Sequence, residues 1–116
     1  MKKNILLIIL LLLIYPAFAQ TSWDESIYEK SKIETELQIY PNPCKNSKVT
    51  VDFKSHNIVS IKLTNITGKQ VLFEEYEIPI NKTQLLLNDI PNGVYIMQVI
   101  TSNQISVVKK LIISRN

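Results

Sequence analysis

The chain has 116 residues, of which 46% are apolar and 20% are charged, with a formal net charge of +3 and one cysteine. This length suits a single domain, and the composition excludes both an intrinsically disordered chain and a polytopic membrane protein. One cysteine allows no internal disulfide, so we expect the fold to depend on an apolar core.

The N-terminus has the three parts of a secretory signal peptide. Two lysines precede an unbroken aliphatic run over residues 5–14, and small residues follow up to Ala19. The apolar run is shorter than the roughly 20 residues that span a bilayer, which argues against an uncleaved anchor. We therefore predict a signal peptide over residues 1–19, with cleavage between Ala19 and Gln20.

Cleavage changes the charge balance of the chain. It removes two lysines and leaves 11 basic and 10 acidic residues, so the basic character of the precursor comes partly from its signal. Nucleic-acid binding needs a clustered basic surface, and the sequence shows none. We predict an exported chain that passes through the general secretion machinery and signal peptidase, does not span a membrane when mature, and binds no nucleic acid.

Residues 20–36 differ in composition from the rest of the chain, with five acidic residues against two lysines. Ser22 and Glu25 have the spacing of a capping box, which would start a short helix. The apolar residues, however, are too thinly spaced for a clear amphipathic helix. We interpret this segment as a short acidic spacer ahead of a domain that covers residues 37–116.

From residue 37 onward the sequence predicts one strand after another. Apolar and polar residues alternate over residues 48–54 and again over residues 59–64, which is the period-two pattern of a half-buried strand. A turn at Thr67-Gly68 then leads into a third strand over residues 70–76, which makes a hairpin.

Three further strands are predicted over residues 84–87, 94–101 and 104–113. The stretch over residues 94–100 is apolar on both faces, which is typical of a strand in the middle of a structure. The polar break at residues 102–103 makes the last two strands another hairpin. Short strands at this spacing, with turns between them, favour a sandwich or a barrel, and we predict two antiparallel sheets.

Two proline-containing segments mark boundaries. Pro91-Asn92-Gly93 has the composition of a turn that releases the chain into the strand at residue 94. In Tyr40-Pro41-Asn42-Pro43, each proline disfavours helix at the residue before it and lacks an N–H that could join a sheet. We expect this second segment to be a stiff entry to the domain, at a sheet edge.

The residues available for catalysis or metal binding are few. His56 is the single histidine, so a zinc site could draw only on His56 and Cys44, and a nucleophilic pair of these two would lack an orienting group. We expect His56 to lie in a polar turn. For Cys44 three states stay open: a free thiol, a buried small apolar residue, or an intermolecular bridge.

The acidic cluster of Glu74, Glu75 and Glu77 invites comparison with calcium sites and glycosidase carboxylate pairs. Strand alternation places Glu75 and Glu77 on one face and Glu74 on the other, so only two could act together. We expect a solvated strand face instead. The sequence therefore predicts no catalytic, metal or cofactor site, and a protein that is not an enzyme.

Four motifs occur in order along residues 37–116, and each is weak alone but specific in combination. They are Ile39-Tyr40-Pro41-Asn42-Pro43, Thr67-Gly68-Lys69-Gln70-Val71, Ile90-Pro91-Asn92-Gly93-Val94-Tyr95 and Lys109-Lys110-Leu111-Ile112-Ile113. In this combination the chain resembles the type A C-terminal sorting domain of the Bacteroidetes type IX (Por) secretion system.

The resemblance implies a small all-β fold, an immunoglobulin-like antiparallel β-sandwich of about seven strands. It also implies a noncatalytic module that directs cargo from the periplasm through the outer-membrane type IX translocon to the medium or the cell surface, where a sortase-like peptidase can remove it and attach the cargo to lipopolysaccharide. The matching positions are the candidate sorting-motif residues: Tyr40, Pro41, Asn42, Pro43, Gly68, Lys69, Gly93, Val94, Tyr95, Lys109 and Lys110.

One departure from the family pattern leaves alternatives open. Family members usually carry a large enzyme or adhesin ahead of the domain, whereas only residues 20–36 precede it here. The chain could be a small secreted protein, a remnant of a larger gene, or a domain kept for its own binding role. The alternative function is a small secreted adhesin-like or carbohydrate-binding sandwich, with Trp23, Tyr28 and Tyr95 as its contact aromatics.

Overall fold

The computed structural model describes the backbone of residues 22–116 and the side chains from residue 29 onward. The predicted signal peptide and its cleavage site between Ala19 and Gln20 lie outside the described residues. Within residues 22–116, no helix is both long and apolar enough to cross a membrane.

The segment interpreted as a spacer is largely helical. Helix α2 (Ser22–Glu36) has 15 residues and begins at the serine of the predicted capping box, but it is longer than the short helix that this box suggested. Most of its residues are good or neutral helix formers, which sustains the helix despite its weak apolar pattern. The compact unit that contains the sheets begins at Ile33, and this side chain packs against the core.

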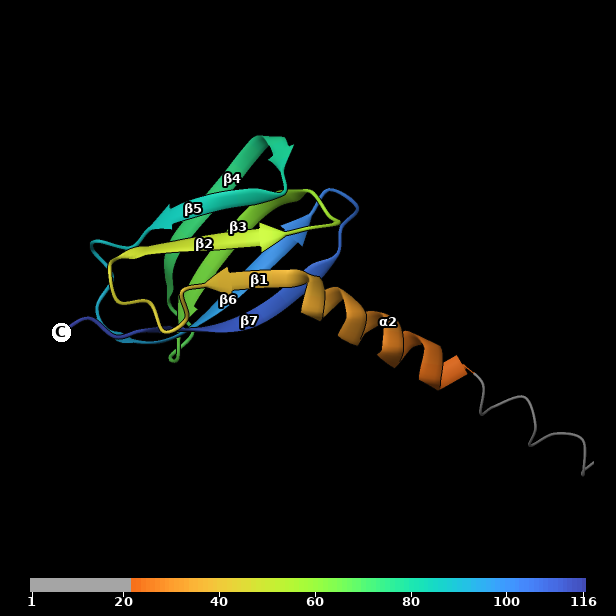
Figure 1. Ribbon diagram of the computed structural model, residues 1–116, viewed down its shortest axis with the longest axis horizontal. Helices are drawn as coiled ribbons and strands as arrows, with labels where there is room; N and C mark the ends of the chain where they lie inside the picture. The colour runs from red at the N-terminus through yellow and green to blue at the C-terminus, as the bar shows by residue number, and fades with distance from the viewer. Residues whose placement is uncertain (1–21) are drawn as a thin grey trace, which may run out of the picture. The chain divides into compact units, whose positions relative to one another are not determined.

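Two antiparallel sheets make up the rest of the structure (Figure 1). The first sheet has the order β1-β2-β5 and consists of β1 (Leu37–Tyr40), β2 (Lys48–Phe53) and β5 (Lys82–Leu86). The second has the order β4-β3-β6-β7 and consists of β3 (Ile58–Asn65), β4 (Gln70–Ile80), β6 (Gly93–Thr101) and β7 (Ser106–Ile113). Three and four strands in two facing antiparallel sheets, with the chain crossing between them, confirm the predicted immunoglobulin-like sandwich.

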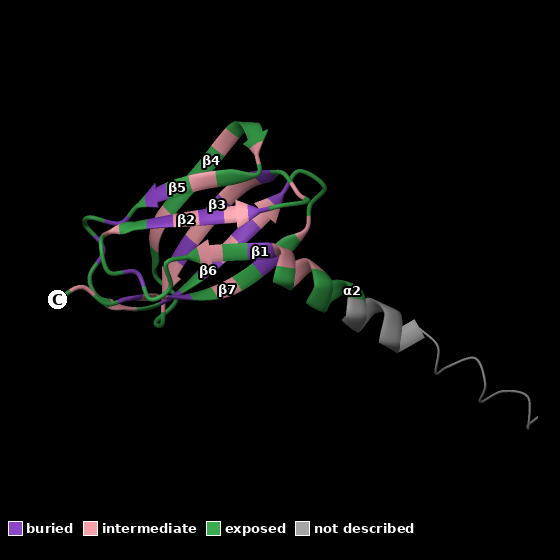
Figure 2. Ribbon diagram, in the orientation of Figure 1, coloured by how far each residue is buried: buried purple, intermediate pink, exposed green. Residues whose placement is uncertain are grey.

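The alternating pattern of the sequence accounts for the core between the sheets. In β2, Val49, Val51 and Phe53 are fully buried, whereas the residues between them are not (Figure 2). The predicted strand ends agree with the structure to within two residues, except that β4 continues to Ile80 rather than ending at residue 76.

The apolar stretch over residues 94–100 forms a central strand, as its pattern indicates, but only one of its two faces is buried. Strand β6 is central in its sheet, between β3 and β7, and it buries Tyr95, Met97 and Val99. Val94 and Ile96 point the other way and are 40% and 38% exposed. In a two-layer sandwich the second sheet covers one face of β6, so its other face meets solvent.

The far half of β4 leaves its ladder with β3. Ser60 pairs with Glu75, but Ile58 pairs with Ile80, so the residues between the two partners bulge away from β3. All three glutamates of the acidic cluster are exposed on this edge strand. A bulged and charged edge is a common way to prevent edge-to-edge pairing with another sheet, which supports the solvated face expected for these carboxylates.

Candidate functional site

Three of the four sequence motifs lie at one end of the sandwich. Strand β3 reaches this end at Asn65, which pairs with Tyr95 near the start of β6, and Gly93 pairs with Ile113 at the end of β7. Cys44, just after β1, lies beside Ile113. We call this region, residues 40–45, 65–69, 91–93 and 112–115, the motif end; in Figure 1 it lies on the side marked C.

The first motif carries the chain from one sheet to the edge of the other. Tyr40 ends β1, and the peptide bonds before Pro41 and Pro43 are both cis. Cys44 N then donates to the carbonyl of Ile112 at 2.7 Å, and Ser114 N donates to the carbonyl of Cys44 at 2.9 Å. The segment is thus an edge element, as its prolines predict.

Between these prolines, the side chain of Asn42 bonds to the backbone of β7. Asn42 Nδ2 donates to the carbonyl of Lys110 at 2.9 Å, and Ile112 N donates to Asn42 Oδ1 at 3.0 Å. The amide presents a donor and an acceptor side by side, as a backbone unit of a neighbouring strand would. Asn42 therefore replaces a strand residue at the edge of β7.

The third motif holds the residue that follows β7 in the same way. Asn92 Nδ2 donates to the carbonyl of Arg115 at 2.7 Å, and Arg115 N donates to Asn92 Oδ1 at 3.0 Å. The Arg115 guanidinium in turn donates to the carbonyls of Leu87 and Ile90 in the loop before β6. No pattern in the sequence indicates these contacts, because they join positions far apart in the chain.

Tyr95 is a structural residue of this motif. Its side chain is 5% exposed, and its hydroxyl donates to the carbonyl of Pro91 at 2.6 Å. A tyrosine near the start of this strand that bonds back to the preceding loop is the tyrosine corner of immunoglobulin-like folds. A Cβ on Gly93 would lie 3.5 Å from the Tyr95 ring, so the turn and the ring pack closely.

The second motif forms the turn of the β3–β4 hairpin. Asn65 Oδ1 accepts bonds from Thr67 N at 3.0 Å, Thr67 Oγ1 at 2.7 Å and Lys69 N at 2.9 Å. Gly68 has a φ of 88°, in the left-handed region where glycine has no steric penalty. Lys69 is exposed at the tip of this turn.

The two lysines of the fourth motif have different surroundings. Lys109 faces the core side of β7 at its edge, is partly buried, and its Nζ donates to the carbonyl of Leu37. Lys110 is exposed on the outer face. Both lie along β7 rather than at the motif end, and only Lys110 presents its charge to solvent.

Cys44 and His56 are not brought together. The Cys44 thiol is fully buried at the motif end and donates to the carbonyl of Lys48 at 3.3 Å. His56 follows β2 at the other end, where its Nε2 lies 3.4 Å from Glu36 Oε2 and its ring contacts Phe53 edge-on. Among residues 22–116, no three His, Cys, Asp or Glu side chains are close enough to hold a metal ion.

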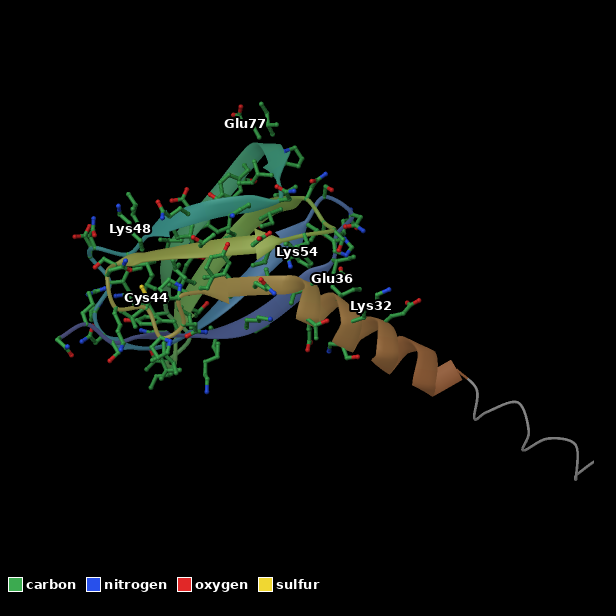
Figure 3. The ribbon with its side chains drawn as sticks, viewed as in Figure 1. Lys32, Glu36, Cys44, Lys48, Lys54 and Glu77 are labelled. Atoms are coloured by element: carbon green, nitrogen blue, oxygen red, sulfur yellow. The ribbon has the colours of Figure 1, made fainter. Side chains whose placement is uncertain are left out.

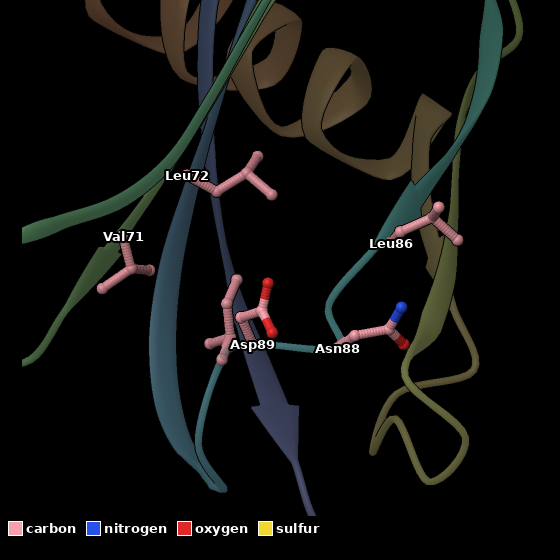
Figure 4. Close-up of a pocket in the computed structure, with 6 residues that line it drawn as sticks. Val71, Leu72, Leu86, Asn88 and Asp89 are labelled. Atoms are coloured by element: carbon pink, nitrogen blue, oxygen red, sulfur yellow. The ribbon is translucent and has the colours of Figure 1, made fainter.

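A shallow pocket of about 340 Å³ opens between the edges of β4 and β5 (Figure 4). Four apolar and two polar residues line it: Val71, Leu72, Leu86 and Ile90, with Asn88 and Asp89. These six residues contain none of the candidate sorting-motif positions, and the pocket lacks the convergent polar groups of a specific ligand site.

Comparison with known families shows which protein family carries this sandwich and its motifs. Residues 38–114 match the family described as the secretion system C-terminal sorting domain. The chain belongs to this family. Its members are sorting domains of type IX secretion. The match begins within β1 and ends just after β7, so it covers the sandwich except Leu37 and includes all four motifs.

Other comparisons are more distant. No curated protein matches the chain. Among solved structures, the crystal structure of CopC from Methylosinus trichosporium OB3b is similar at 16% identity and a TM-score of 0.43, over 69% of this chain and 93% of that one. The assignment of this sorting domain to the immunoglobulin-like sandwiches therefore rests on its own strand order.

Two residues of the motif end were missed from the sequence. Asn92 and Arg115 were not among the candidate positions, although they connect the third motif to the end of β7. One signal was available: Asn92 and Asn42 both follow a proline in a segment next to a strand. The role of the eleven candidate residues in sorting stays a prediction.

Proposed function

We propose that this sorting domain directs export across the outer membrane through the type IX translocon, from the periplasm to the cell surface or the medium. The observation that carries the proposal is that the family match, residues 38–114, coincides with the folded sandwich and includes all four motifs. In this proposal the domain is noncatalytic, and its partners are the translocon and a sortase-like peptidase.

The motif end is the surface that we assign to recognition. Loops held by a rigid scaffold are common recognition elements, and here three motifs distant in sequence form one such set. Its exposed charges include Lys45 and Lys69, and the basic Lys48 begins β2 beside Cys44 (Figure 3). Such a surface favours an acidic partner.

A reporter fusion tests the export role. A fluorescent protein is placed between the predicted signal peptide and residues 20–116, and expressed in hosts with and without the translocon. We expect the reporter in the medium or on the surface of the first host and in the periplasm of the second. Retention in the periplasm of both hosts would rule the role out.

Charge reversal tests where recognition occurs. We expect Lys45→Glu with Lys69→Glu to reduce export of the fusion, because both lysines are exposed at the motif end. The matched control is Lys54→Glu with Lys82→Glu, since these exposed lysines lie at the opposite end of β2 and β5. An equal loss in both variants would place recognition elsewhere.

Surface attachment is a separate part of the proposal. The intact mass of the product recovered from medium, periplasm and cell surface reports signal-peptide cleavage, removal of the domain, and any attached lipopolysaccharide. A surface-bound product that keeps residues 37–116 and carries no added mass would exclude processing by a sortase-like peptidase.

The adhesin-like or carbohydrate-binding alternative loses one of its three expected contact residues. Tyr95 is buried, and its hydroxyl bonds to its own chain. Trp23 and Tyr28 belong to the residues whose side chains are not described. We therefore propose no binding function of that kind.

A further inference from the structure

Strand β7 is an edge strand, and part of its open edge is covered in an unusual way. The backbone groups of Ile112 bond to Asn42 and Cys44 rather than to β6, so the even-numbered residues of β7 direct their N–H and C=O groups to the free edge. From the Lys110 carbonyl to the Ser114 N–H these groups have partners. Lys110 O and Ile112 N bond to the Asn42 amide, and Ile112 O and Ser114 N bond to the backbone of Cys44. On the other side, towards β6, the N–H and C=O groups of Arg115 bond to the Asn92 amide, which directly precedes β6.

Side chains hold residues 110–115 from both sides, Asn42 from the free edge and Asn92 from the side of β6. Two asparagine amides supply four of these six bonds, and the backbone of Cys44 supplies the other two. Because the ladder between β6 and β7 does not include them, the side-chain bonds can be lost while the sandwich stays folded. The path of residues 110–115 thus depends on two side chains from two different motifs.

Both asparagines follow a proline, Pro41 and Pro91, whose ring fixes φ. A backbone with little freedom presents the amide with little loss of conformational entropy, which is the effect of preorganisation. The two amides therefore hold the end of β7 in one position relative to the other loops of the motif end.

We propose that Asn42 and Asn92 are positioning residues of the sorting signal. They keep residues 110–115 in a single path, and this gives the motif end the shape that the secretion machinery recognises. The proposal rests on the proposed export function, and it adds Asn92 to the residues on which that function depends.

Hydrogen exchange tests the structural step on the purified chain, residues 20–116. Loss of either amide removes two bonds, so Asn42→Ala should speed exchange at Ile112 N–H, and Asn92→Ala at Arg115 N–H, by about tenfold. The double variant should gain about a hundredfold over residues 112–115. Protection at Ile61 and Leu63, in the centre of β3, should stay unchanged.

Matched variants separate the amide bonds from a general effect of losing an asparagine. Asn46→Ala and Asn88→Ala each remove an exposed asparagine, one from the segment after Cys44 and one from the loop before β6. Neither should alter exchange at Ile112 or Arg115. Unchanged exchange in the Asn42 and Asn92 variants would overturn the proposal at this step.

Export of the reporter fusion tests the functional step. In this proposal only chains that hold residues 110–115 in their single path are exported. The exported fraction therefore falls strongly only when most chains have released these residues. We expect each single variant to keep most of its export and the double variant to lose about tenfold. The control is Ile61→Val, a buried truncation in β3 that lowers the melting temperature without touching the motif end.

The outcomes are distinct. Greater loss of export in the double variant than in Ile61→Val, at equal or smaller loss of melting temperature, supports positioning. Equal export of the double variant and of Ile61→Val overturns the positioning role. The two asparagines would then only stabilise the fold. If the double variant loses protection at Ile61 and Leu63, Asn92→Asp takes its place in the same comparison. Aspartate keeps the size of the asparagine side chain but loses the N–H donor to the Arg115 carbonyl. A wild-type fusion that stays periplasmic overturns the export function itself.

Discussion

At the scale of single residues, the buried hydroxyl of Tyr95 is the first test of the fold. Tyr95→Phe removes the bond to the Pro91 carbonyl but keeps the ring that packs against Gly93. We expect a loss of about 1 kcal/mol, seen as a lower urea midpoint at an unchanged slope. Tyr40→Phe is the control, because Tyr40 is 40% exposed at the end of β1. Equal midpoints for the two variants would contradict the tyrosine corner.

Gly68 gives a second test at this scale, because backbone geometry alone sets the free-energy cost of substituting it. Its φ is +88°, and a Cβ would meet nothing within 4 Å. Gly68→Ala should therefore lose about 1 kcal/mol from the left-handed conformation. Gly68→Asn should lose less, since asparagine tolerates this region. Thermal unfolding checks the order, and equal melting temperatures for Ala and Asn would show that the turn relaxes to another conformation.

Local signals in the sequence explain which residues could be foreseen. Gly68 and Pro41 impose backbone geometry that is visible from the residue itself. The partners of Asn42 and Asn92 are backbone groups some 70 and 23 positions away, and no spacing in the chain encodes them. The motifs could therefore be found from the sequence, but what Asn92 and Arg115 contact could not.

At the scale of elements, β7 carries two adjacent lysines that should behave differently. Lys109→Met keeps the apolar stem but removes the ammonium that bonds to the Leu37 carbonyl, and we expect it to cost about 1 kcal/mol or more. Lys110→Met, on the exposed face, should have almost no effect. Urea unfolding of both variants is the measurement. Equal stability would show that the bond to Leu37 contributes nothing.

Period-two alternation is the reason that the strands could be predicted. It places β2 and β3 correctly because one face of each is buried by the other sheet, whereas β6 was predicted from a continuous apolar run. Alternation does not predict how far an exposed edge strand runs, so the extension of β4 to Ile80 and its bulge were not foreseen. Likewise, α2 lacks a strong apolar stripe, and its length was underestimated.

At the scale of the whole molecule, the Cys44 thiol reports how often the sandwich opens. Cys44 is fully buried between the first motif and β7, which among the three open states favours a small buried residue. We expect a thiol reagent to label it only through opening, so the labelling rate should rise steeply with urea along with loss of the fold. Fast labelling of the native chain would contradict this burial.

The position at which the folded unit begins is the last test, because it limits where cargo can be joined or removed. The sequence places the domain boundary at Leu37, whereas the compact unit starts at Ile33. Ile33 packs against the core, and the Glu36 carboxylate accepts a bond from Ser55 and lies 3.4 Å from His56 Nε2.

Chains that start at residues 20, 33 and 37 separate these two boundaries. The first two should unfold at the same urea concentration, and the third should lose about 1 kcal/mol, since it lacks the half-buried Ile33 side chain and the contacts of Glu36. Equal stability of all three would move the boundary back to Leu37. With the boundary at Ile33, a peptidase that releases an intact sandwich must cut before this residue, within or ahead of α2, and cargo must be joined there.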